Sequence, residues 1–119
     1  MTRTEYGPLP RLNITEEILT EAIFQILKGR TGGINFNSIA NAFKQLVDAD
    51  PEKYGVSAHP NVRYQGGLDR NDISRIREII WDWIILRYLT PGNYQDDKWP
   101  ELSITKKGQL FFAGSDPQP

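Results

Sequence analysis

Three stretches of the chain carry apolar residues at intervals of three and four, the spacing of a helix with one buried face. Before the first stretch, Asn13 and Glu16 have the spacing of a capping box, and Gly29 ends its pattern. Pro51 follows the second stretch and prevents its extension. The predicted helices are Thr15 to Lys28, a second that begins after a cap at Asn37 or Ser38 and ends near Asp48, and Asp72 to Tyr88.

Two shorter stretches alternate between apolar and polar residues, as strands with one buried face do. The first, Ile34 to Phe36, follows a turn at Gly32-Gly33 and lies between the first two helices. The second, Leu102 to Thr105, lies beyond the third helix. Their positions predict a very short strand between helices and a strand that closes the domain.

The segment around the second strand has the pattern of a β-ribbon. A turn at Leu89 to Gly92 leaves the third helix, a polar hairpin tip follows from Asn93 to Lys98, and Trp99-Pro100 opens the returning strand. Lys106 to Gly108 breaks the strand, and Leu110 to Phe112 returns apolar surface to the body. The predicted fold is therefore mainly α with a small β-ribbon: a winged helix of three helices and a short antiparallel wing.

A resemblance to a known family supports this prediction. The run from Ile73 to Gly108 looks like the C-terminal half of bacterial winged helix-turn-helix domains. Trp99 to Gly108 is similar to their wing, in which a β-branched residue and Thr precede a Gly by a fixed step, and to the closing wing of uncharacterised bacterial proteins with Trp-Pro before that step. The resemblance covers about a third of the chain closely. It implies a domain that docks on nucleic acid or on another protein.

The rest of the chain departs from a minimal winged helix. Residues 1–12 are predicted to form an arm, because Pro8 and Pro10 forbid a helix. The domain proper is expected at 13–113, followed by a frayed tail at 114–119. Within it, residues 50–69 form a long connection rich in Pro and Gly, whereas a tight helix-turn-helix has a turn of three or four residues.

Composition limits the possible functions. The 119 residues contain no cysteine, which excludes disulfides and thiolate metal sites and favours the cytoplasm. The sequence has no apolar run of the ~20 residues needed to cross a bilayer, so no membrane partner is expected. The net charge is −1, whereas dedicated nucleic-acid modules usually carry a basic excess. The charge is the main observation against nucleic-acid binding.

The third helix would carry the DNA contacts of such a domain. Its core side is expected to hold Ile73, Ile76, Ile80, Trp83 and Ile84. The opposite arc also includes Asp82, and the charges on this arc sum to −1. The residues expected to face bases are Asn71, Ser74, Arg75 and Glu78, and those expected to hold phosphates are Arg70, Arg77, Lys106 and Lys107.

The second half of this helix is apolar almost all round, which requires burial on most sides. The residues outside the core stripe are Ile79, Trp81, Ile85 and Leu86. The arm, through Leu9 and Leu12, could cover them within one chain. A second copy could also cover them, and a homodimer would present two helices to a palindromic site.

Catalytic or metal chemistry has little support in the sequence. His59, the only histidine, has no second ligand or carboxylate pair arranged around it, and Gly32-Gly33 lacks the lysine of a phosphate loop. We expect no enzyme activity, cofactor or metal. The leading hypothesis is a small bacterial winged-helix protein that binds double-stranded DNA, as a regulator or as the DNA-facing subunit of a larger system. The alternative is a protein-interaction module that does not bind DNA.

Overall fold

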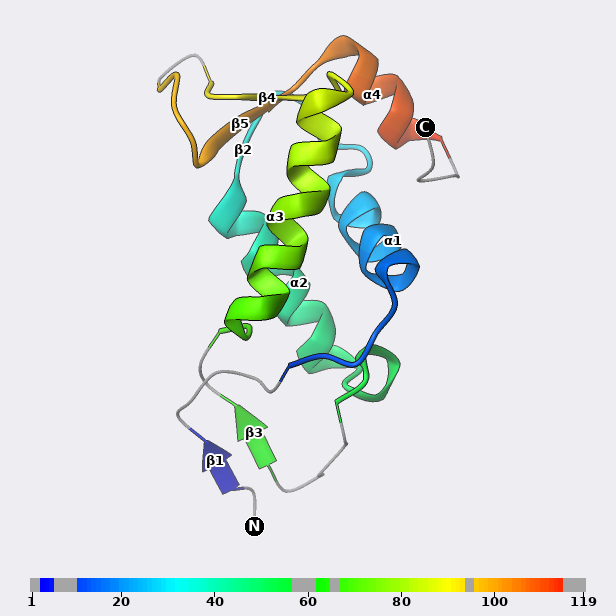
Figure 1. The fold of residues 1–119 in the computed structure, drawn as a ribbon, viewed down its shortest axis with the longest axis vertical. Helices are drawn as coiled ribbons and strands as arrows, with labels where there is room; N and C mark the ends of the chain where they lie inside the picture. The colour runs from blue at the N-terminus through cyan, green and yellow to red at the C-terminus, as the bar shows by residue number, and fades with distance from the viewer. Residues whose placement is uncertain (1–2, 6–10, 57–61, 65–66, 94–95, 115–119) are drawn as a thin grey trace.

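Four helices and a three-stranded antiparallel sheet form the body of the described chain (Figure 1). The structure is a computed structural model that describes residues 3–5, 11–56, 62–64, 67–93 and 96–114. The helices are α1 (Glu16–Leu27), α2 (Phe36–Ala49), the 3-10 helix η1 (Glu52–Tyr54), α3 (Arg70–Ile85) and α4 (Lys106–Ala113). The strands are β1 (Arg3–Glu5), β2 (Gly33–Asn35), β3 (Val62–Tyr64), β4 (Leu89–Pro91) and β5 (Glu101–Ile104).

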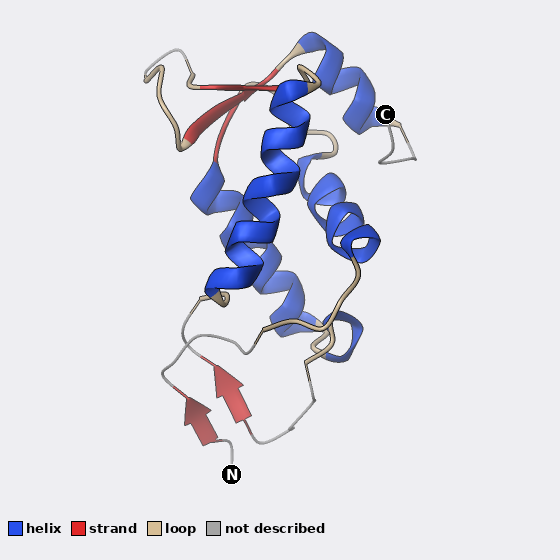
Figure 2. Cartoon of the chain, in the orientation of Figure 1, coloured by secondary structure: helices blue, strands red, loops and turns tan. Residues whose placement is uncertain are grey.

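The three-stranded sheet has the order β2-β5-β4, with both neighbouring pairs antiparallel. Ile34 of β2 lies opposite Leu102 of β5, and Leu89 of β4 lies opposite Ile104 of β5. All four side chains are buried, so one face of the sheet closes the core. The prediction of a mainly helical fold with a small β-ribbon is confirmed at this level. Figure 2 shows this sheet at one end of α3 and the separate parallel pair β1-β3 at the other.

The N-terminal caps of α1 and α2 differ from the predicted ones, and the cap of α3 was not predicted. Thr15 caps α1, its hydroxyl accepting from the Ile18 N–H, so the capping box at Asn13 and Glu16 is wrong. Asn35 caps α2 through the Asn37 N–H, and the predicted caps Asn37 and Ser38 lie inside the helix. Asp69 caps α3. Each cap satisfies a backbone donor that has no partner within its helix.

The end of α3 leads directly into the sheet. Arg87, just past the helix, adopts a left-handed conformation with φ 66°, and the Tyr88 N–H donates to the Trp83 carbonyl (2.8 Å). This hydrogen bond is typical of a Schellman cap, which terminates a helix and redirects the chain. α3 therefore ends before the predicted Tyr88, and most of the predicted turn at 89–92 is strand β4.

The sequence predicted three helices and a break at Lys106 to Gly108. The structure has a further helix, α4, that begins at this break. Thr105 caps it by accepting from the Gly108 N–H (2.9 Å) and donates to the Arg87 carbonyl (2.6 Å). Phe112 is buried, and its ring centroid lies 5.7 Å from that of Phe24 and 5.1 Å from that of Trp83. The Thr-x-x-Gly step is thus the first turn of a helix that seals the core, and not the exit of a strand.

The long connection between α2 and α3 is partly ordered against the body. Tyr54 of η1 is buried, with its ring edge-on to Phe43 of α2 (5.3 Å), and Leu68 is also buried. β3 pairs with β1 of the N-terminal arm, which ties the arm to this connection. The described part of 50–69 therefore has secondary structure of its own. Residues 57–61, which include His59, and 65–66 lie outside the described residues, as do Leu9 and residues 115–119 of the tail predicted at 114–119.

Candidate interaction surface of helix α3

One polar face of α3 is exposed along the first half of the helix. Asn71, Ser74 and Glu78 lie in solvent, and Arg70 and Arg77 lie exposed beside them. The two arginines form no hydrogen bond or ion pair with any of the described residues. The spacing of three and four residues places these side chains on one side of the helix. This face can therefore bring amide, hydroxyl, carboxylate and guanidinium groups to a partner together.

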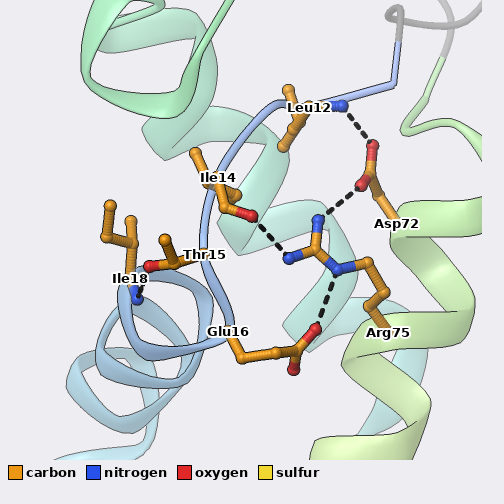
Figure 3. Close-up of polar contacts among 7 residues, drawn as sticks. All are labelled: Leu12, Ile14, Thr15, Glu16, Ile18, Asp72 and Arg75. Carbon is orange, nitrogen blue, oxygen red and sulfur yellow. Dashed lines mark hydrogen bonds and ion pairs between the residues drawn. The ribbon is translucent and has the colours of Figure 1, made fainter.

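Arg75 does not belong to this face, which corrects the sequence prediction. Its side chain is 18% exposed and its guanidinium is bound within the protein (Figure 3). Nε donates to Glu16 (3.0 Å), Nη2 to the Ile14 carbonyl (2.7 Å), and Nη1 to Asp72 (3.4 Å). Arg75 lies on the flank of α3 that faces the start of α1, where Ile14 and Glu16 accept its hydrogen bonds. A guanidinium with all three nitrogens engaged fixes α3 rather than reading a base.

Asp72 is the buried carboxylate that the sequence analysis missed. It is 1% exposed, and its second oxygen accepts from the Leu12 N–H (2.9 Å). A buried carboxylate needs hydrogen bonds to offset its lost hydration, and the arm and Arg75 supply them. Its position four residues before Ile76, on the core side of the helix, was the signal available in the sequence.

The two lysines predicted to hold phosphates lie in the first turn of α4, not on the ribbon. The Lys107 ammonium donates to the Leu86 carbonyl at the end of α3 (3.0 Å) and lies 5.1 Å from the Tyr88 ring. Lys106 is exposed and forms no polar contact within the described part of the chain. The predicted phosphate contacts are thus divided between the beginning of α3 and the α4 end of the molecule.

Of the four residues predicted as an apolar interface, two belong to the protein's own core. Ile79 is 5% exposed within the core, and Leu86 is partly buried against it. The excess apolar surface expected from these two residues is therefore covered within the chain, fully for Ile79 and in part for Leu86. Trp81 is 41% exposed and Ile85 is 75% exposed. The loop before β5 supplies part of the cover for Trp81, whose indole stacks on Trp99 (5.6 Å between ring centroids).

The described part of the arm contacts the N-terminal end of α3, whereas Trp81 and Ile85 lie toward its C-terminal end. Leu12 is buried at Asp72, in the first turn of α3 (Figure 3). The rise of a helix places Ile85 about 20 Å further along. Leu12 therefore does not cover the exposed second half, and Leu9 lies outside the described residues.

The described side chains show no arrangement for metal chemistry: within the described ranges no three His, Cys, Asp or Glu residues group to hold a metal. None of the described helices is long and apolar enough to span a bilayer. No family model, curated protein or solved structure gives a significant match to the chain. The class defined by the fold is thus a mainly helical protein with a small three-stranded antiparallel sheet, and function is inferred from the surface of α3.

Proposed function

We propose that this protein is a winged-helix protein that binds double-stranded DNA, as a regulator or as the DNA-facing subunit of a larger assembly. The element order supports the proposal: a short strand, β2, lies between α1 and α2, and α3 leads into the β4-β5 ribbon. The middle position of β5 in the sheet joins the ribbon to the strand between the helices. The proposed activity is binding and not catalysis.

The observation that carries the proposal is the exposed polar face in the first half of α3. A helix of this size fits the major groove of DNA, where side chains reach base edges. Asn71 and Ser74 have the hydrogen-bonding groups for such contacts, and Glu78 can accept from a cytosine amino group. Arg70 and Arg77 flank them and would hold phosphates.

Both ends of α3 are fixed to the body, which would hold this face in one orientation. Arg75 and Asp72 bind the segment before α1, and Lys107 binds the carbonyl of Leu86, the residue that caps the C-terminus of α3. In this proposal Arg75 positions the helix and does not contact bases. Lys106 remains a phosphate ligand, and Lys107 could add a contact only by leaving the Leu86 carbonyl.

Duplex DNA of random sequence at about 50 and 200 mM salt tests the proposal, because each phosphate contact contributes about −0.9 to the log–log slope of affinity against salt. Two or three contacts predict a slope of roughly −2 to −3. The double variant Arg70→Ala, Arg77→Ala should reduce both affinity and slope. The matched control, Arg30→Ala with Lys53→Ala, removes the same charge from the end of α1 and from η1 and should leave the slope unchanged. Absence of binding at the lower salt would overturn the proposal.

The second candidate function is a protein-interaction module without DNA binding. The observation in its favour is the exposure of Trp81 and Ile85 on a helix that is otherwise well packed. Large apolar side chains exposed on one helix often mark a protein contact when they lie together. In that case neither the Arg70→Ala, Arg77→Ala variant nor its control would bind DNA in a salt-dependent way.

A further inference from the structure

The exposed face of α3 changes character along the helix. Its first half is polar, whereas its second half carries the apolar side chains of Trp81 and Ile85. The helical spacing places Glu78, Trp81 and Ile85 on one side, with Asp82 at its edge, and all four are exposed. We call these four residues together with Trp99 the aromatic face.

The aromatic rings of this face pack on one another within the chain, without a partner. Trp81 stacks on Trp99 at an interplanar angle of 22°, and Trp99 in turn packs on Phe36 at the start of α2 (4.9 Å between ring centroids). The three rings come from α3, from the loop before β5 and from α2, so they join three elements. An aromatic side chain held in this way loses little conformational entropy on binding.

The charges around the aromatic face are mostly negative. Glu78 and Asp82 lie on either side of Trp81 along α3 and form no ion pair with the described residues. Asp96 and Asp97, both exposed, lie on the loop that leads to Trp99. The cations nearest in sequence are Arg77, Arg87 and Lys98, so four carboxylates stand against three positive groups, and two of the carboxylates flank Trp81 itself.

This combination disfavours DNA and favours a basic protein segment. Phosphates would be repelled by the carboxylates, and Ile85 would lose water without gaining an apolar contact. An arginine side chain instead can stack on an indole face and pair with a carboxylate at once, and aliphatic side chains of the same segment can cover Ile85. Charge complementarity thus selects the occupant.

We propose that the aromatic face docks an arginine-bearing, amphipathic segment of a partner protein. The inference does not rest on DNA binding, because the two surfaces share only Glu78, and Trp81, Asp82 and Ile85 lie further along α3 than Arg70, Asn71 and Ser74. A protein that binds both partners would hold DNA on the first half of α3 and a basic partner on the second.

The test uses the full chain and a short labelled peptide of arginine, leucine and glycine, with a second peptide in which glutamate replaces arginine. Fluorescence anisotropy should show binding of the first peptide only, weakening as salt rises. Ile85→Ser and Trp81→Ala should each weaken binding, Trp81→Ala by about tenfold, as expected for truncation of an interface tryptophan. Thermal denaturation checks that Trp81→Ala folds, and Ile85, at 75% exposed, can be changed without disturbing the core.

A charge-matched pair of variants separates this face from general attraction to an acidic protein. Glu78→Gln with Asp82→Asn should weaken binding, whereas Glu17→Gln with Glu52→Gln removes the same charge from α1 and η1 and should not. Equal weakening by both pairs, or no binding at all, overturns the proposal. Light scattering tests whether a second copy of the chain occupies the aromatic face. A dimer that Ile85→Ser dissociates would assign the face to that second copy and would also overturn the proposal. DNA binding that persists in Ile85→Ser would keep the two proposals separate.

Discussion

Gly108 lies in the first turn of α4, where the backbone of Tyr88 passes against it. A Cβ at this position would overlap the Tyr88 carbonyl oxygen, and the atoms it would meet are backbone, which cannot rotate away. Gly108 is therefore required for close approach between α4 and the end of α3. Its own backbone is helical, so a special backbone conformation is not the reason for glycine here.

Replacement of Gly108 by Ala is expected to destabilise the protein. Forcing a methyl group into a packed site typically costs about 1–3 kcal/mol, and Gly108→Val should cost more than Gly108→Ala. Urea denaturation measures the loss. Gly67→Ala is the control, because a Cβ there meets nothing within 4 Å, and it should change the unfolding free energy little. Equal midpoints for Gly108→Ala and Gly67→Ala would contradict the close approach.

At the level of elements, the sequence predicted the periodic parts and missed the ends. Three helices and the closing strand lie within a few residues of the predicted ranges, because each buries a face whose period is visible in the sequence. The caps differ because Asn, Ser and Thr occur close together before α1 and α2, and only the path of the chain selects one. α4 was missed because it is short and has Gly108 in its first turn, which has the appearance of a break.

The site on α3 was predicted in part for the same reason. Periodicity separates exposed from buried sides, and it placed Asn71, Ser74 and Glu78 in solvent. It cannot show which neighbouring element lies against a flank. Arg75 is bound by the segment before α1, some sixty residues away in sequence, and Ile79 is covered by the core. Both are contacts between distant parts of the chain, for which one sequence contains no local signal.

Two arginines on α3, only two positions apart, should differ in how much the same substitution lowers the stability of the protein. Arg75→Met removes three donors and leaves the Ile14 carbonyl and the Asp72 carboxylate short of partners, an effect of about 1–3 kcal/mol on the unfolding free energy. Arg77→Met removes an exposed side chain with no such contacts and should change stability by less than about 0.5 kcal/mol. Parallel urea titrations measure both.

Arg77→Met should lower the affinity for DNA, because it removes a proposed phosphate contact. Arg75→Met should leave the affinity unchanged when the two variants are compared at equal folded fraction. If Arg75→Met leaves the unfolding midpoint unchanged and instead alters base preference, Arg75 reads bases and the network of Figure 3 is not formed in solution. The comparison thus tests the correction to the sequence prediction as well as the packing.

For the whole molecule, the order of the three long helices and the closing strand could be predicted, but β1, η1, β3, α4 and the surfaces that remain exposed could not. The sequence left open whether the arm or a second copy covers the second half of α3. In the structure, Leu12 packs in the first turn of α3, and the arm continues to β1, which pairs with β3 away from the sheet (Figure 1). The loop before β5 contributes Trp99 as the contact of Trp81. The positions of Leu12 and of Trp99 both depend on the path of long connections, which the periodicity of apolar residues does not determine.

Removal of residues 1–12 is therefore expected to lower stability without exposing Trp81. The truncation withdraws the buried Leu12 side chain, a loss of about 1.5–3 kcal/mol, and the donor to Asp72. Urea denaturation should show this loss, while acrylamide quenching of tryptophan fluorescence at low urea stays at its full-length value. Leu12→Ala in the full chain separates the side chain from the rest of the arm and should account for much of the effect. Stronger quenching after truncation, together with a rise in mass by light scattering, would mean that the arm covers the second half of α3 after all.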